Sequence, residues 1–293
     1  IMVFPLTLGR IVESFRNILT NDSQEDGINL NTAKQITKAT IYIFIAGLEL
    51  IAIYMSGSRG PLLGLMASVY FLVLLLSIHW RKRWLTFTIV GMALVGATFL
   101  LVFNLQNSPF NTLKSSTAIG RFGKLLDPQS NSALVRQYIW EGTVKLVGIH
   151  DPLKFPDGSS DSFNGLRPII GYGPEAMYVA YNQFYQPELG QVEKRNASPD
   201  RAHNETWDSI IITGFAGLFV YLTIFSSIIY YGLKWQGLIK TPRNKTFFFI
   251  CLAGGGIIGS ISLIILKGIE FLGVGLPFGI IIGVVIYLTI EAL

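Results

Sequence analysis

Long apolar runs alternate with shorter polar stretches along this chain of 293 residues. A helix needs about 20 apolar residues to cross the hydrocarbon core of a bilayer, and six runs reach or approach that length. The pattern therefore predicts an all-α fold, a polytopic membrane helix bundle with about six spans. In chain order the runs cover residues 39–55, 61–78, 84–103, 209–232, 246–266 and 271–293.

Composition agrees with a membrane protein. Charged residues make up 14% of the chain and the mean hydropathy is +0.48, whereas soluble domains carry about 25% charged residues. A single cysteine, Cys251, excludes a disulfide within the chain and a cysteine-based metal cage. The chain starts at Ile1 rather than Met, and both of its ends fall within apolar runs, so we expect it to be an internal piece of a longer protein.

The distribution of charge predicts the topology. Residues 104–207 carry ten Lys/Arg and ten Asp/Glu, so the net charge of +5 comes from the rest of the chain. That excess lies in short connectors, at Arg81 to Arg83 and between Lys234 and Lys245. By the positive-inside rule both connectors are cytoplasmic. The segment 104–207 then lies on the outer face, and nucleic-acid binding is not expected from the basic pI.

These boundaries divide the chain into three parts: N-terminal transmembrane segments (1–103), a large outer loop (104–207) and C-terminal transmembrane segments (208–293). Loops longer than about 15 residues are usually functional or disordered, and the aromatic content of this one favours order and function. We predict a helix at 133–147, capped by Asn131 or Ser132, and a second short helix at 175–184. Residues 1–8 are predicted to end another helix, and 21–38 to form a polar connector.

One candidate anion site lies at the predicted outer end of a span. Ser58, Arg59 and Gly60 lie in a break before Pro61 starts the next run. Backbone N–H groups at a helix start, together with a guanidinium, suit a phosphate. The alternative is that Arg59 snorkels into lipid head groups.

A second candidate site precedes the fourth span. His203 lies beside Arg201 and Asn204, and histidine is the usual general base near neutral pH; an exposed or helix-capping histidine is the alternative. For Arg136, on the predicted loop helix, the residues alone favour a surface position. Glu49, a carboxylate within a span, is a functional candidate or a packing residue with a hydroxyl or backbone partner.

Three local patterns occur in a characteristic order around the long loop. They are Ser58-Arg59-Gly60 before Pro61-Leu-Leu-Gly64, Arg136 and Trp140 before Arg167-Pro-Ile-Ile-Gly-Tyr-Gly173, and His203-Asn204 before Trp207 and Gly214-Phe-Ala-Gly217. Together they resemble the O-antigen ligase and polymerase superfamily of bacterial membrane glycosyltransferases. The resemblance extends over roughly residues 41–233.

The resemblance implies a multi-pass protein of the bacterial cytoplasmic membrane that moves a glycan from an undecaprenyl-pyrophosphate carrier to an acceptor hydroxyl, with inversion and without a metal or other cofactor. Arg59 and Arg136 match the arginines that hold the pyrophosphate, and His203 matches the general base. Ser58, Gly60, Arg201 and Asn204 are further candidate substrate contacts. The implied partners are the lipid-linked donor, a lipid or protein acceptor and membrane lipids.

Several alternatives remain open at the level of sequence. An O-antigen polymerase or a protein O-oligosaccharyltransferase differs from a ligase only in its acceptor. A transporter with Glu49 and Arg59 along its path is a different class, but it predicts inverted repeats, which the sequence lacks. A sensor with a ligand-binding loop is a third.

Overall fold

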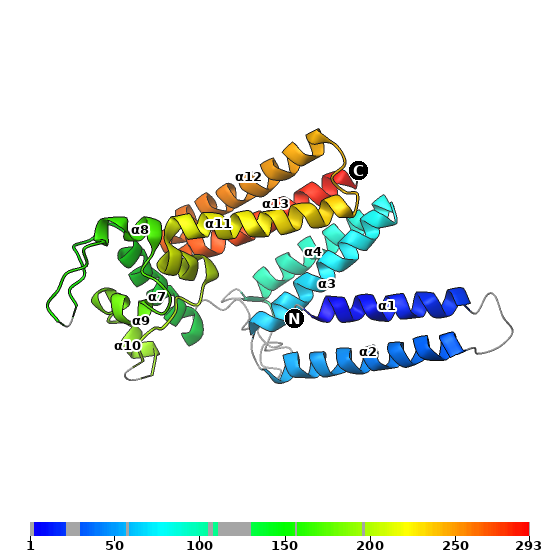
Figure 1. Ribbon diagram of the computed structural model, residues 1–293, viewed down its shortest axis with the longest axis horizontal. Coiled ribbons are helices and arrows are strands. Elements are labelled where there is room, and N and C mark those ends of the chain that lie inside the picture. The colour runs from blue at the N-terminus through cyan, green and yellow to red at the C-terminus, as the bar shows by residue number, and fades with distance from the viewer. Residues whose placement is uncertain are drawn as a thin grey trace. The chain divides into compact units, whose positions relative to one another are not determined.

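The computed structural model describes residues 3–21, 30–56, 59–104, 108–110, 130–155, 157–194 and 197–292. Its contacts divide the chain into two compact units, chiefly Ile1–Asn111 and Thr112–Glu291 (Figure 1). The second unit combines most of the polar loop with the C-terminal helices. The three-part division predicted above follows membrane topology, which these contacts do not test.

The first unit holds four helices: α1 (Phe4–Asn21), α2 (Leu30–Met55), α3 (Arg59–His79) and α4 (Arg83–Asn104). The helices α1 and α2 lie side by side (Figure 1), with Phe4 and Thr7 of α1 buried. The predicted helix tail instead continues to Asn21 as α1, and residues 30–38 of the predicted connector belong to α2, while residues 22–29 lie outside the described residues. The buried residues of α2, Thr32, Ala39 and Ala46, recur every seven residues, so its polar beginning continues the same face as its apolar part.

Six helices of the described part of the chain are long and apolar enough to span a membrane, which confirms the predicted number of spans. The described residues also contain no strand, which confirms the all-α prediction. In the second unit these spans are α11 (Glu205–Trp235), α12 (Pro242–Lys267) and the continuous segment of η3 (Ile269–Phe271) with α13 (Leu272–Glu291).

Glycines hold α12 and α13 together. A side chain at Gly259 would meet the backbone at Gly275 and Gly279, and one at Gly283 would meet the carbonyl of Cys251. The two backbones therefore approach more closely than larger residues would permit. Small residues at such contacts are typical of membrane helices, where packing rather than the hydrophobic effect drives association.

The polar loop contributes short helices to the second unit: α7 (Asn131–Val147), η1 (Asn164–Leu166), α8 (Arg167–Ile170), α9 (Met177–Ala180), η2 (Tyr181–Phe184) and α10 (Leu189–Val192). The predicted loop helix is confirmed as α7, but its N-cap is Ser130 rather than Asn131 or Ser132. The second predicted helix is shorter, since Glu175 has a left-handed φ of 58° and α9 begins only at Met177.

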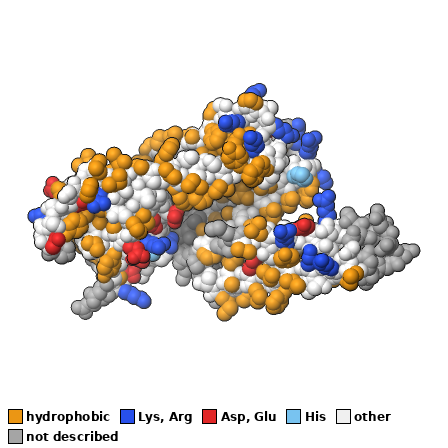
Figure 2. Space-filling model, viewed as in Figure 1, with side chains coloured by type: hydrophobic (Ala, Val, Ile, Leu, Met, Phe, Trp, Pro, Cys, Tyr) orange, Lys and Arg blue, Asp and Glu red, His pale blue; other side chains and the backbone are white. Residues whose placement is uncertain are grey.

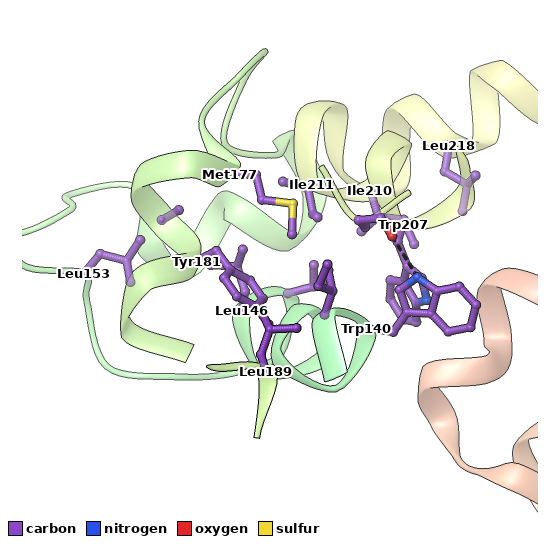
Figure 3. Packing of buried hydrophobic residues seen from close by; sticks show 14 residues of the cluster. Trp140, Leu146, Leu153, Met177, Tyr181, Leu189, Trp207, Ile210, Ile211 and Leu218 are labelled. Atoms are coloured by element: carbon purple, nitrogen blue, oxygen red, sulfur yellow. Dashed lines mark hydrogen bonds between the residues drawn. The ribbon is translucent and has the colours of Figure 1, made fainter. Parts of the chain in front are cut away.

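One hydrophobic core joins this loop to the start of α11. Tyr181, Leu146 and Leu189 of the loop are fully buried, and Ile210 and Ile211 of α11 lie in the same cluster (Figure 3). At 1.5 Å per residue the 31 residues of α11 extend about 46 Å, whereas the hydrocarbon core is about 30 Å thick. The first turns of α11 therefore belong to the loop core rather than to the span.

A break at Gly214 separates the two parts of α11. Gly214 has non-helical angles (φ 68°, ψ −175°), which interrupts the helical hydrogen-bond pattern. The freed carbonyls of Ile211 and Ile212 accept hydrogen bonds from the backbone N–H groups of Tyr172 (2.7 Å) and Gly173 (3.0 Å). Irregular backbone near a membrane needs such internal partners, because lipid offers none.

The close contact at this break requires glycine on both sides. Gly171 has φ +76°, and a Cβ there would collide with the backbone of Ile212 and Thr213; a Cβ on Gly214 would collide with Ile169. We expect Gly171→Ala to destabilise the protein by about 2–4 kcal/mol, since backbone strain and overpacking act together. The midpoint of thermal unfolding in detergent measures the effect, with an expected loss of roughly 5 °C or more.

Gly173→Ala is the matched control. Gly173 also has a left-handed φ, of +98°, but open space surrounds the position of its missing Cβ. Its substitution adds backbone strain without a collision. Equal destabilisation by the two variants would show that the close approach at Gly171 is not what holds this contact.

Candidate functional site

His203 occupies an unusual backbone position just before α11. Its φ of 52° lies in the left-handed region, and its side chain is exposed. Histidine, like Asn and Asp, adopts this region more often than most residues, but a non-glycine residue there still merits attention. Such conformations persist where the surroundings over-determine them, and they cluster at functional sites.

The residues beside His203 fix its backbone. The Ala202 carbonyl accepts a hydrogen bond from Trp140 Nε1 at 2.8 Å, and the Ala202 N–H donates to Asp208 Oδ1 at 2.7 Å. On the other side Asn204 caps α11, its Oδ1 accepting from the N–H groups of Thr206 and Trp207. The chain is therefore held immediately before and after His203 while the imidazole remains accessible.

The beginning of α13 supplies a third support. Trp207 Nε1 donates to the Glu270 carbonyl at 2.9 Å, and a Cβ on Gly273 would collide with Asn204 and Trp207. Elements far apart in sequence, from α7 to α13, thus converge around the segment that carries His203. The two tryptophans appear close together in Figure 3, one with its hydrogen bond drawn.

Two of the predicted substrate contacts are exposed cations in the same unit. Arg136 lies on α7 four residues before Trp140, and so on the same side of that helix. Arg201 lies two residues before His203. Both side chains are exposed, and neither forms a hydrogen bond or an ion pair with the described residues. Both guanidinium groups are therefore available to an anion.

The third predicted cation belongs to the other unit. Arg59 is the first residue of α3, but its side chain, like Ser58, lies outside the described residues. Gly60 is exposed, with open space around its missing Cβ. The convergence of Arg59 with Arg136 and His203 therefore stays a prediction.

The interpretation of Glu49 as a packing residue requires a hydroxyl or backbone partner. The structure shows a hydroxyl partner. Thr7 of α1 donates to Glu49 Oε1 at 3.2 Å, so this carboxylate links α1 to α2. Its Oε2 is buried and has no partner among the described residues. No cluster of three or more His, Cys, Asp or Glu side chains in the described part of the chain is suited to a metal ion.

Sequence reasoning missed an ion pair in the loop. Arg167 donates from Nε to Asp161 Oδ2 (2.7 Å) and from Nη2 to Oδ1 (3.0 Å), and Asp161 is almost fully buried. The guanidinium also lies over the ring of Tyr172, where burial raises the pKa of the phenol to about 12. Arg167 is therefore fully engaged within the protein, although it belongs to one of the three family-like patterns.

The imidazole of His150 packs within the loop, although the polar sequence around it favours a solvated residue. The ring is half-buried, with Nε2 2.9 Å from Tyr172 Oη and Nδ1 2.6 Å from the carbonyl of Asp151. The ring also packs edge-on against Phe184. His150 thus connects the end of α7 to the segment that packs against α11. His150 and Tyr172 are too far apart in sequence for a local pattern to predict their contact.

The fold and composition define a multi-pass membrane protein. Residues 43–153 match the family described as O-antigen ligase (Wzy_C), and this match supports the O-antigen ligase and polymerase superfamily. The matched segment includes Arg59 and Arg136 and ends before His203. No curated protein and no solved structure matches the chain significantly.

The Asp161–Arg167 pair predicts a pH dependence of stability. The hydrogen bonds from Arg167 hold the pKa of Asp161 below its ordinary value of 3.8. The pair's contribution is therefore complete above pH 3.8 and is lost as the pH falls through the lower pKa of the folded state. Asp161→Asn should cost about 3 kcal/mol at neutral pH, since it leaves Arg167 without its charged partner.

Chemical denaturation of the protein in detergent between pH 7 and pH 2.5 measures this effect. The difference between the wild type and Asp161→Asn should shrink towards the acid end. Asp151→Asn, at an exposed carboxylate of the same loop, is the control and should change stability little at any pH. A deficit of Asp161→Asn that stays constant down to pH 2.5 would contradict the role of the charge.

Proposed function

We propose that the protein is a membrane glycosyltransferase of ligase type, which transfers a glycan from an undecaprenyl-pyrophosphate carrier to an acceptor hydroxyl. In this proposal Arg59 and Arg136 bind the pyrophosphate and His203 is the general base. The family match supports a membrane enzyme of O-antigen ligase or polymerase type. The observation that carries the finer assignment is the fixed backbone around an exposed His203.

The reaction makes few demands on the protein. The acceptor oxygen attacks the anomeric carbon from the side opposite the pyrophosphate, the C–O bond to the carrier breaks with its electron pair, and His203 takes the hydroxyl proton. The leaving pyrophosphate gains negative charge, which guanidinium groups stabilise more strongly in the transition state than in the bound substrate. Two arginines and a base are sufficient for these steps.

The acceptor distinguishes the alternatives within the same chemistry. A growing glycan as acceptor makes the protein a polymerase, and a protein hydroxyl makes it an O-oligosaccharyltransferase. Exposed Arg136 and Arg201 near the His203 segment favour an anionic substrate in all three cases. A transporter does not require a general base held at the edge of the membrane. We therefore favour the transferase over the transporter.

His203 and Arg136 are tested by transfer assays on membranes that contain the full-length protein, with lipid-linked glycans extracted from the source organism as donor. His203→Asn should lower the rate at least 100-fold, since a general base typically contributes that much or more. Asn tolerates the left-handed backbone, so the fold should persist. Arg136→Ala should lower the rate to a similar degree through lost pyrophosphate binding.

Arg243→Ala is the matched control, because Arg243 is an exposed arginine at the start of α12 in the basic connector. It should retain the wild-type rate. Undiminished glycan transfer by His203→Asn and Arg136→Ala, at wild-type levels of protein in the membrane, would end the proposal.

Trp140 is proposed as a positioning residue, because its indole fixes the carbonyl next to His203. Trp140→Phe should lower kcat about tenfold and leave the KM for the donor nearly unchanged, since the base is displaced while the anion site remains. Trp84→Phe, at an exposed position on α4, is the control and should change neither constant. An unchanged kcat for Trp140→Phe in correctly folded protein would contradict this role.

A further inference from the structure

Four large apolar side chains lie together on an exposed turn of the second unit. They belong to the residues that enter and form η1 and α8, and we call them the α8 patch: Phe163, Leu166, Ile169 and Ile170, each between 50% and 57% exposed. Figure 2 shows hydrophobic side chains over the position of α8, with those of α11 beyond them. Contiguous exposed apolar surface of this kind marks a contact with lipid or with another protein.

The position of α8 along α11 places the patch at the edge of the membrane. The short α8 packs against α11, where the Ile169 backbone meets Gly214. From Phe215 to Trp235 the helix rises about 30 Å, which matches the thickness of the hydrocarbon core. Gly214, and α8 with it, therefore lies where α11 leaves the hydrocarbon on the loop's side.

The patch also continues a surface that faces lipid. Phe215 and Phe219 follow Gly214 on α11 and are 48% and 71% exposed, as expected for side chains of a span that contact acyl chains. The α8 patch thus adds to the exposed apolar surface of a transmembrane helix rather than forming an isolated island in water. This continuity favours lipid over a soluble partner.

The charged side chain of this segment is largely buried. Arg167 is the only charged residue between Ser162 and Pro174, and its side chain is only 20% exposed. Both oxygens of Asp161 accept from it, and its Nη1 donates to the Gly171 carbonyl at 3.1 Å. A cation at a lipid boundary requires such a partner, whereas in water an exposed pair would contribute little.

We propose that the α8 patch is inserted into the acyl chains of the membrane leaflet on the loop's side. It anchors the loop to the lipid surface beside α11, and the Asp161–Arg167 pair beneath it removes the charge that would oppose insertion. The occupant of the patch is therefore bilayer hydrocarbon. This inference does not rest on the proposed transferase activity and applies to any function of the loop.

Fluorescence quenching in proteoliposomes tests the insertion. In a Cys251→Ala background, Ile169→Cys is labelled with bimane and reconstituted with or without lipids brominated on their acyl chains. We expect brominated lipids to lower the emission of this label about twofold, and iodide in the water to have little effect. Phe163→Cys, at a second position of the patch, should give the same result.

Gln191→Cys provides the matched control, since Gln191 is an exposed residue of α10 in the same unit. Its label should be quenched by iodide and not by brominated lipid. Quenching of the Ile169 label by iodide to the same degree would place the patch in water and overturn the proposal. Protection of that label from both quenchers would also overturn it, because protein, either a second copy or a partner, would then cover the patch.

Discussion

The contact between two irregular backbone segments at Gly214 is the constraint on which the second unit depends. A broken helix leaves carbonyl groups without helical partners, and lipid could not replace those partners. The N–H groups of Tyr172 and Gly173 meet that need through Ile211 and Ile212. The same contact attaches the polar loop to α11. The break in the helix and the ordered conformation of the loop therefore depend on one contact.

The candidate site follows from that attachment. Because the first turns of α11 lie in the loop core, the segment that leads into them is fixed by α7 on one side and by the start of α13 on the other. His203 is thereby held in a left-handed conformation with its ring exposed. A base that is rigid in its backbone and open to substrate is what proton transfer from a bound hydroxyl requires.

Charge in the loop is used in two ways. Arg167 pairs with buried Asp161 and lies over the ring of Tyr172, where it stabilises the fold of the loop. Arg136 and Arg201 remain exposed and without an acidic partner among the described residues. Residues of one type thus divide into a structural group and a group available to an anionic substrate, and only the partners of each side chain reveal the difference.

The sequence by itself determined the six spans, the all-α class and the helix at α7, because each of these depends on local apolar length and periodicity. It also drew attention to His203 and Arg136 through residue type and local pattern. Tertiary structure alone decided that Trp207 donates to the carbonyl of Glu270 and that Arg167 pairs with Asp161. It likewise decided that Trp140 reaches the carbonyl of Ala202. These contacts join residues whose partners are set by packing in three dimensions, and side-chain direction and burial are not encoded in the spacing of residues along a chain.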